Sequence, residues 1–174
     1  MNGNGIVRRM DELGRIVIPK ELRRTLRLRE GDEMEIFSEG EKLVIKKYSR
    51  FETFVRTTES AARALHDRTG CTVLIVASDE IVAAAGKRKK ELTGKSVSRQ
   101  LADMIAEKKT VTRAAAGEFS PAEDVSLPAD GVAAAPVAAA GDVLGTVVCV
   151  GDGAAERADY LEFTAELLAA VLAE

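Results

Sequence analysis

The sequence predicts an α+β protein in two parts: a small, mostly β-stranded domain over residues 1–50 and a larger domain over residues 51–174, in which helices flank a β-sheet. Short apolar runs separated by turn residues fill the first part, whereas the second mixes helical periodicity with strands. The charge changes at the same place. Residues 1–50 hold 12 Lys and Arg against 9 Asp and Glu, a net +3, whereas residues 51–174 hold 13 against 19, a net −6. The total charge of −3 therefore combines a basic first part with an acidic second part, which indicates two domains with different functions.

The head, residues 1–50, begins with two short apolar runs. We expect strands at residues 6–7 and 16–18, joined by a turn at residues 11–14. Pro19 then opens a short helix to about Leu28, because proline fits the first helical turn. A β-hairpin completes a β-β-α-β-β order, with a positive φ at Gly31 and strands at residues 33–37 and 42–47.

A domain of this size buries too little surface to be stable alone. The expected strand at residues 16–18, Ile-Val-Ile, is apolar on both faces, so something outside a single four-stranded sheet must cover one of them. We therefore expect an obligate homodimer with interleaved hairpins. Such a dimer would present two copies of each basic side chain to a partner with twofold symmetry.

Cations gather in the head. Between positions 8 and 29 the chain places eight cations against three anions, and residues 30–41 then hold six acids and no base. This segregation is typical of a surface that faces phosphates. A solvated charged face is the usual explanation for a lone arginine, but not for eight cations within 22 residues. These cations are Arg8, Arg9, Arg15, Lys20, Arg23, Arg24, Arg27 and Arg29.

The stretch GIVRRMDELGRIVIPKELRRTLRLREGDEMEIF at residues 5–37, followed by KLVIKKY at residues 42–48, resembles the swapped-hairpin AbrB-type domain of bacterial transition-state regulators. The resemblance implies an intertwined homodimeric β-barrel that binds double-stranded DNA. Only one short helix precedes residue 50, so a helix-turn-helix is excluded, and loops and strands would make many of the contacts. The arginines that match the family's DNA contacts, with Arg9 as an added candidate, are Arg8, Arg9, Arg15, Arg23 and Arg24.

The second domain alternates helices and strands in an order that resembles a GAF domain. It lacks the N-K-x-F-D-E signature of cyclic-nucleotide-binding relatives, so that ligand class is not supported. Together, head and body resemble a transcription regulator of sporulation. The expected elements are helix 51–69, strands 72–77 and 81–85, helix 97–108 capped by Ser96, strand 110–114, loop 115–131, strands 132–139 and 144–150, and helix 156–173.

The last expected helix carries two apolar stripes, whereas a helix on one face of a sheet needs only one. We expect the second stripe to pack against a partner subunit and join dimers into a tetramer; the alternative is that both stripes lie in one core. Alanine-rich strands leave volume for a small-molecule ligand of unknown class, which would shift the geometry of the head. The first stripe is Ala158, Leu161, Ala165, Leu168 and Leu172, and the second is Tyr160, Phe163, Leu167 and Val171.

No constellation in the sequence supports catalysis, a metal or a cofactor. His66 is the only histidine, and Cys71 and Cys149 stand far apart in apolar runs, as expected for reduced core thiols of a cytosolic protein. The TGKS segment at residues 93–96 lacks the first glycine of a phosphate loop, because Lys89 occupies that position. Without a signal peptide or an apolar run of membrane-spanning length, the expected location is the cytoplasm, at the nucleoid.

The leading hypothesis is therefore a sequence-specific, signal-responsive transcription regulator and not an enzyme. An antitoxin-type autoregulator would carry the same AbrB/MazE-like head. Its tail is usually extended, however, whereas residues 51–174 hold enough apolar residues for a core. An enzyme built on the GAF scaffold would need a catalytic group, and no base stands near a nucleophile in the sequence.

Overall fold

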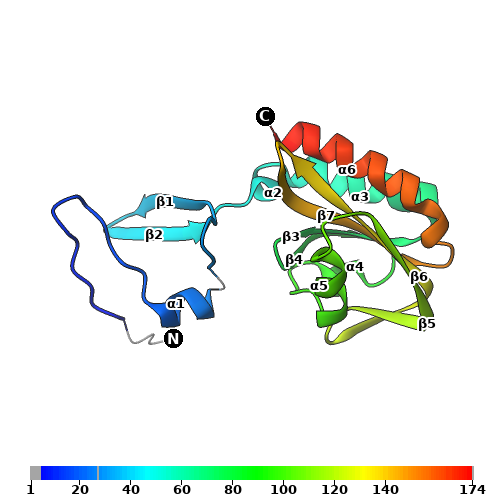
Figure 1. Ribbon diagram of the computed structural model, residues 1–174, viewed down its shortest axis with the longest axis horizontal. Helices are drawn as coiled ribbons and strands as arrows, with labels where there is room; N and C mark the ends of the chain where they lie inside the picture. The colour runs from blue at the N-terminus through cyan, green and yellow to red at the C-terminus, as the bar shows by residue number, and fades with distance from the viewer. Residues whose placement is uncertain (1–4, 27, 174) are drawn as a thin grey trace. The chain divides into compact units, whose positions relative to one another are not determined.

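The structure, a computed structural model, describes residues 5–26 and 28–173 (Figure 1). The chain divides into two compact units, one ending at Tyr48 and one beginning at Ser49. Arg27, one of the eight cations of the head, lies outside the described residues.

The N-terminal unit contains one short helix and one hairpin: α1 (Lys20–Thr25), β1 (Met34–Glu39) and β2 (Lys42–Lys47). The two strands pair antiparallel, with Ile36 opposite Ile45. Gly31 has a φ of +86°, which confirms the expected left-handed turn. Helix α1 ends earlier than the expected residue 28.

The first two expected strands do not form within a single chain. A turn joins residues 5–11 to residues 15–19: the Gly14 N–H donates to the Asp11 carbonyl at 3.0 Å, and Gly14 has a φ of +75°. Beyond the turn, where the Asp11 N–H donates to the Arg15 carbonyl at 3.1 Å, the two arms form no strand, and their apolar side chains stay in solvent, with Val7 88% and Val17 77% exposed. The prediction of strands at these positions is wrong for the isolated chain, because neither arm joins the two-stranded sheet of β1 and β2.

The N-terminal unit has no core of its own. Pro19 is the one buried residue in its described part, and even Leu22 and Leu26, one helical turn apart, are 39% and 58% exposed. A small unit cannot remain folded with its apolar side chains in water. Its exposed large apolar residues are Ile6, Val7, Met10, Leu13, Ile16, Val17, Leu22, Leu26, Ile36, Phe37, Leu43, Ile45 and Tyr48.

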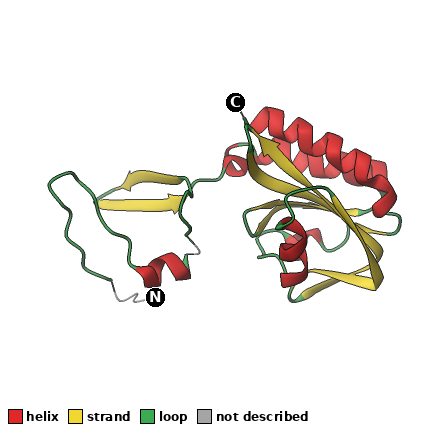
Figure 2. Ribbon diagram, in the orientation of Figure 1, coloured by secondary structure: helices red, strands yellow, loops and turns green. Residues whose placement is uncertain are grey.

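The C-terminal unit is built on one antiparallel sheet in the order β4-β3-β7-β6-β5. Its strands are β3 (Thr72–Ala77), β4 (Glu80–Ala85), β5 (Val111–Ala122), β6 (Val125–Ala139) and β7 (Asp142–Gly151). Helices cover both faces (Figure 2). One face carries α2 (Arg50–Thr53), α3 (Val55–Thr69) and α6 (Ala158–Leu172), which follows a 3-10 turn at Ala155–Arg157; the other carries α4 (Lys89–Leu92) and α5 (Arg99–Ile105).

Alternation along the strands divides the apolar side chains between two cores. On β3, Val73 and Ile75 join the core beneath α3 and α6, whereas Leu74 and Val76 join the core beneath α4 and α5. The alanines at residues 133–135 are buried in these same two cores. Cys71 and Cys149 are buried free thiols.

Two local predictions in the C-terminal unit are wrong. The segment expected as a loop at residues 115–131 forms most of the long hairpin of β5 and β6. Gly117, with a φ of +88°, and Pro121 suggested a loop, but β5 is an edge strand with irregular register, where such residues are tolerated. Helix α5 begins later than expected, because the side chain of Ser98, not Ser96, caps it by accepting from the Leu101 N–H at 3.2 Å.

The two stripes of α6 have different surroundings. Leu161, Leu168 and Leu172 are buried against the sheet, whereas Phe163 is 67% and Leu167 54% exposed. The alternative that both stripes lie in one core is therefore wrong for the described chain. In that part of the chain no helix combines the length and apolar character needed to cross a membrane.

Candidate nucleic-acid interface

Helix α1 presents the densest group of cations in the N-terminal unit. Lys20, Arg23 and Arg24 are spaced three and four residues apart, so they share one side of the helix. Together with Leu28 and Arg29 they line a hollow of about 400 Å³. All four cations are exposed, and the described chain supplies no side-chain ion pair to any of them. Their positive charge is therefore available to a partner.

The turn between the two arms holds a fifth cation in place. The Asp11 carboxylate accepts the backbone N–H of Arg15 at 2.8 Å, its Nε at 2.7 Å and the Leu13 N–H at 3.0 Å. The Arg15 backbone N–H, and then its guanidinium, hold the pKa of Asp11 below its usual value. Because only Nε is used, both Nη atoms of Arg15 remain as donors.

Arg8 and Arg9 lie on the extended arm at residues 5–11 and are exposed. Neighbouring side chains on an extended chain point to opposite sides, so one surface does not present both equally. Neither lines the α1 hollow, and nor does Arg15. The five arginines singled out from the sequence thus fall into three groups within one chain: the arm, the turn and the helix.

Two cations of the hollow, Lys20 and Arg29, were not among those five candidates. The helical spacing of Lys20 from Arg23 and Arg24 is visible in the sequence and could have placed it there. Arg29 carried no such signal, because it follows the end of α1 and reaches the hollow only through the fold.

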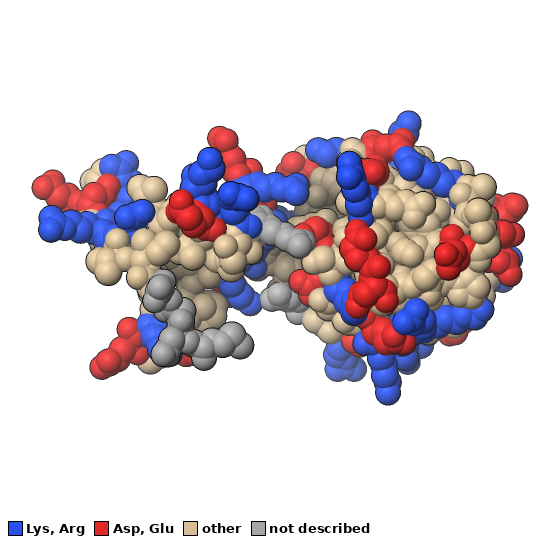
Figure 3. All heavy atoms as spheres, turned by 90° about the horizontal axis from the view of Figure 1, so that it is seen from below, with Lys and Arg blue, Asp and Glu red and all other residues tan. Residues whose placement is uncertain are grey.

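The hairpin of β1 and β2 is electrostatically different. Lys46 pairs with Glu35 and Lys47 with Asp32, each at 3.1 Å. Burial raises the pKa of Asp32, but the Arg29 N–H and the Lys47 ammonium outweigh it and lower the pKa overall. Figure 3, which looks at the molecule from below, shows Asp and Glu as well as Lys and Arg on the surface of the N-terminal unit. Arg15 of the turn is likewise paired, with Asp11, so the unpaired positive charge of the candidate interface is that of α1 and the arm.

Two family models cover nearly the whole chain. Residues 55–174 match the model described as stage V sporulation protein T C-terminal, transcription factor. Residues 7–53 match the model described as antidote-toxin recognition MazE, bacterial antitoxin.

Among individual relatives, the chain is 38% identical over 149 residues to stage V sporulation protein T of Bacillus subtilis (strain 168), across 85% of this chain and 84% of the relative. It is 58% identical over 48 residues to the transition state regulatory protein AbrB of the same organism, across 28% of this chain and 50% of that one. The type II free methionine-R-sulfoxide reductase of Thermoplasma acidophilum has a similar fold, with a TM-score of 0.55 at 13% identity, across 71% of this chain and 95% of that structure.

These matches confirm the resemblance of the head to AbrB-type domains and of the whole chain to a sporulation regulator. The N-terminal unit is an AbrB-like DNA-binding domain, and the C-terminal unit, an antiparallel sheet flanked by helices, is a stage V sporulation protein T C-terminal domain. The family is one of transcription factors and not of enzymes. With an AbrB-type head joined to this body, the chain belongs to the stage V sporulation protein T family of sporulation transcription regulators.

Proposed function

We propose that this regulator binds double-stranded DNA as a homodimer through the cations of α1, the turn and the arm. The observation that supports this most strongly is the α1 hollow, where four exposed cations without described ion pairs lie together. Arginine on such a surface contacts phosphates and reads base edges. The proposed contacts are Arg8, Arg9, Arg15, Arg23 and Arg24, with Lys20 and Arg29 added from the hollow.

The absence of a core in the described N-terminal unit of one chain supports the homodimer. Two unpaired arms and a hairpin, all with exposed apolar side chains, are what half of an interleaved barrel would expose. Pairing with a second copy would bury Val17 and Ile36 and give the arms at residues 5–11 and 15–19 their missing strand partners.

The C-terminal unit, we propose, joins two dimers into a tetramer through the outer stripe of α6. Tyr160, Phe163 and Leu167 are 40%, 67% and 54% exposed, an unusual density of apolar surface on one helix. A small molecule bound by this unit would shift the geometry of the heads through its differential affinity for two states. The regulator would act in the cytoplasm, at the nucleoid.

An antitoxin-type autoregulator is less well supported. The antitoxin model matches only residues 7–53, whereas residues 55–174 match a transcription-factor model. The C-terminal unit is also a folded domain with two cores and not an extended tail.

DNA affinity measured against salt concentration tests the proposal. Six to ten phosphate contacts would give a log–log slope of about −5 to −9. The assay uses the full chain and a pool of duplex fragments, read by fluorescence anisotropy between low and physiological salt. A flat dependence on salt would rule out the arginine-rich surface as the DNA interface.

A further inference from the structure

A second basic hollow lies in the C-terminal unit, along the outer edge of strand β4. Its volume is about 840 Å³, and we call it the β4-edge groove. Helix α3, on one face of the sheet, forms one wall, and α4, on the other face, forms the opposite wall. The groove thus lies at the rim of the sheet and outside the two cores. Its lining is Glu59, Arg63, His66, residues 83–87, Lys89, Lys90 and Thr93.

The floor of this groove is an open strand edge. Strand β4 stands at the end of the sheet and pairs only with β3. Its first half is already covered, because residues 94–97 run antiparallel to it: the Ile81 N–H donates to the Lys95 carbonyl at 2.9 Å, and the Gly94 N–H donates to the Ile81 carbonyl at 2.8 Å. Beyond Ile81, no described residue pairs with the outer side of β4. The edge therefore accepts a strand-like segment and has room for more of one.

Small side chains keep this edge accessible. Residues 83–85 are alanines, and Gly86 adopts a φ of +103°. A Cβ on Gly86 would stand 3.0 Å from the Thr72 Cα and 3.1 Å from the His66 ring, so no side chain can occupy that point. The His66 Nδ1 donates to the Cys71 carbonyl at 2.6 Å, which fixes the ring and leaves Nε2 as its remaining polar atom.

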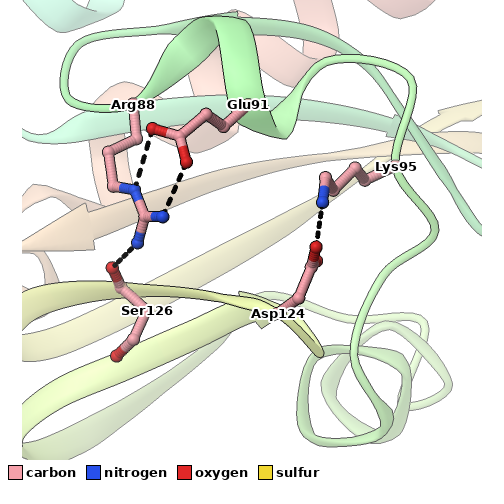
Figure 4. A network of polar contacts seen from close by, with 5 residues as sticks. All are labelled: Arg88, Glu91, Lys95, Asp124 and Ser126. Carbon is pink, nitrogen blue, oxygen red and sulfur yellow. Dashed lines mark hydrogen bonds and ion pairs between the residues drawn. The ribbon is translucent and has the colours of Figure 1, made fainter.

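The walls carry unbalanced positive charge. Arg63, Lys87, Lys89 and Lys90 stand against one acid, Glu59, on a unit that is acidic as a whole. None of these four cations has an ion-pair partner in the described chain. The cations just outside the groove are different (Figure 4): Arg88 forms a bidentate pair with Glu91 and donates to the Ser126 carbonyl, and Lys95 pairs with Asp124. Around the groove, therefore, the cations that line it are unpaired, whereas these two neighbours outside it are neutralised.

We propose that the β4-edge groove binds an acidic segment of another protein in extended conformation, as a strand added to β4. Main-chain hydrogen bonds to the open edge would provide affinity, and Arg63, Lys87, Lys89 and Lys90 would select acidic side chains. A second copy of this chain fits poorly, because two such grooves placed edge to edge would bring eight cations together. A small anion would use the cations but leave the strand edge unpaired.

The test is binding of a fluorescein-labelled acetyl-(Glu-Val)4-amide peptide to the full chain, followed by anisotropy at low salt. We expect saturable binding that is lost when every peptide N–H is replaced by N–CH3, because that change keeps the charge and removes the main-chain donors. Amide hydrogen exchange of residues 82–86 should slow when the peptide binds. Absence of binding up to about 1 mM peptide, or equal binding of the N-methylated peptide, overturns the proposal.

Two double variants with the same charge change test whether peptide binding depends on the groove or only on the overall charge of the protein. Lys89→Glu/Lys90→Glu should weaken peptide binding by about tenfold or more, whereas Lys108→Glu/Lys109→Glu, which makes the same charge change at exposed positions outside the groove, should leave it unchanged. Equal loss in both variants, or displacement of the peptide by inorganic triphosphate or by duplex DNA at equal charge concentration, contradicts strand addition. DNA binding by the head should be the same in both variants, which keeps this test independent of the proposed DNA interface.

Discussion

The Asp11 carboxylate holds Arg15 at two points, its backbone N–H at 2.8 Å and its guanidinium Nε at 2.7 Å. One acid therefore both shapes the turn and orients the arginine that the turn presents. Asp11→Asn should weaken DNA binding by about tenfold at most, because Arg15 must then be ordered at the moment of binding. Fluorescence anisotropy with duplex DNA measures this, and Glu12→Gln, at the exposed neighbouring position, is the control.

The pH dependence of this turn follows from the lowered pKa of Asp11. An acid whose pKa is lower in the folded state contributes its stabilisation above its ordinary value, here 3.8, and loses it only as the pH falls through the lowered value. The Leu13 and Arg15 amides should therefore keep their chemical shifts from neutral pH to below 3.8 and change only in stronger acid. A transition near neutral pH would contradict the ion pair.

The cations of α1 should dominate the salt dependence of DNA binding. Each lost phosphate contact flattens the log–log slope by about 0.9, so Arg23→Ala/Arg24→Ala should flatten it by about 3.6 in a dimer. Lys47→Ala is the control, because that ammonium is already neutralised by Asp32 at 3.1 Å. An unchanged slope in the double variant would remove α1 from the interface.

A charge at Val17 should prevent the heads from pairing. This side chain is 77% exposed in one chain, and the proposed dimer would bury it. Val17→Glu should therefore halve the mass measured by light scattering and abolish DNA binding by the full chain. Val143→Glu, at an exposed apolar position of the C-terminal unit, should change neither. A Val17→Glu chain of full mass would argue against interleaved arms.

The outer stripe of α6 can be tested without damage to the core. Phe163→Glu/Leu167→Glu should convert tetramers into dimers and leave the circular dichroism spectrum unchanged, because both side chains are exposed in one chain. Leu168→Glu/Leu172→Glu should instead unfold the unit, since each of these leucines is 1% exposed and no water can reach the new charge. A tetramer that persists in the first variant would rule out this interface.

Gly145 marks a close approach between β7 and the start of the C-terminal unit. A Cβ there would lie 2.5 Å from the Val76 carbonyl oxygen and 2.6 Å from the Phe51 ring. Gly145→Ala should lower the free energy of unfolding by about 2 kcal/mol. Gly131→Ala, where the nearest atom is 3.6 Å away, should change it by less than about 0.5 kcal/mol. Urea denaturation of both variants compares them directly.

The regular parts of the fold were readable from periodicity. Strand β3 spans Thr72–Ala77, as expected, because a six-residue apolar run between turn signals is too short for a typical helix and suits a buried strand. The β5–β6 hairpin was missed, since Gly117 and Pro121 are loop signals that an edge strand tolerates, and the position of β5 at the edge is a property of the whole sheet. The cap of α5 was misplaced by two residues, because Ser96 and Ser98 offer the same local signal and only the fold selects between them.

At the candidate interface, clustering along the chain gave eight cations, and the family resemblance selected Arg23 and Arg24 among them, which stay neighbours in space because they share one short helix. Clustering could not bring Arg29 to the same hollow or separate Arg15 from them, because those positions depend on how the chain returns after α1 and on the Asp11 turn. Likewise, Lys87, Lys89 and Lys90 are neighbours in the sequence, but only the fold places them beside α3 and the open edge of β4.

The order of the residues alone determined the two-part architecture, the family and the set of basic side chains available to DNA, because these depend on composition, local periodicity and short-range spacing. Only the tertiary structure decided which stripe of α6 is buried, that the N-terminal unit of one chain lacks a core, and that unpaired cations line an open strand edge. Burial and strand pairing are relations between segments far apart in the chain, and no local pattern contains them.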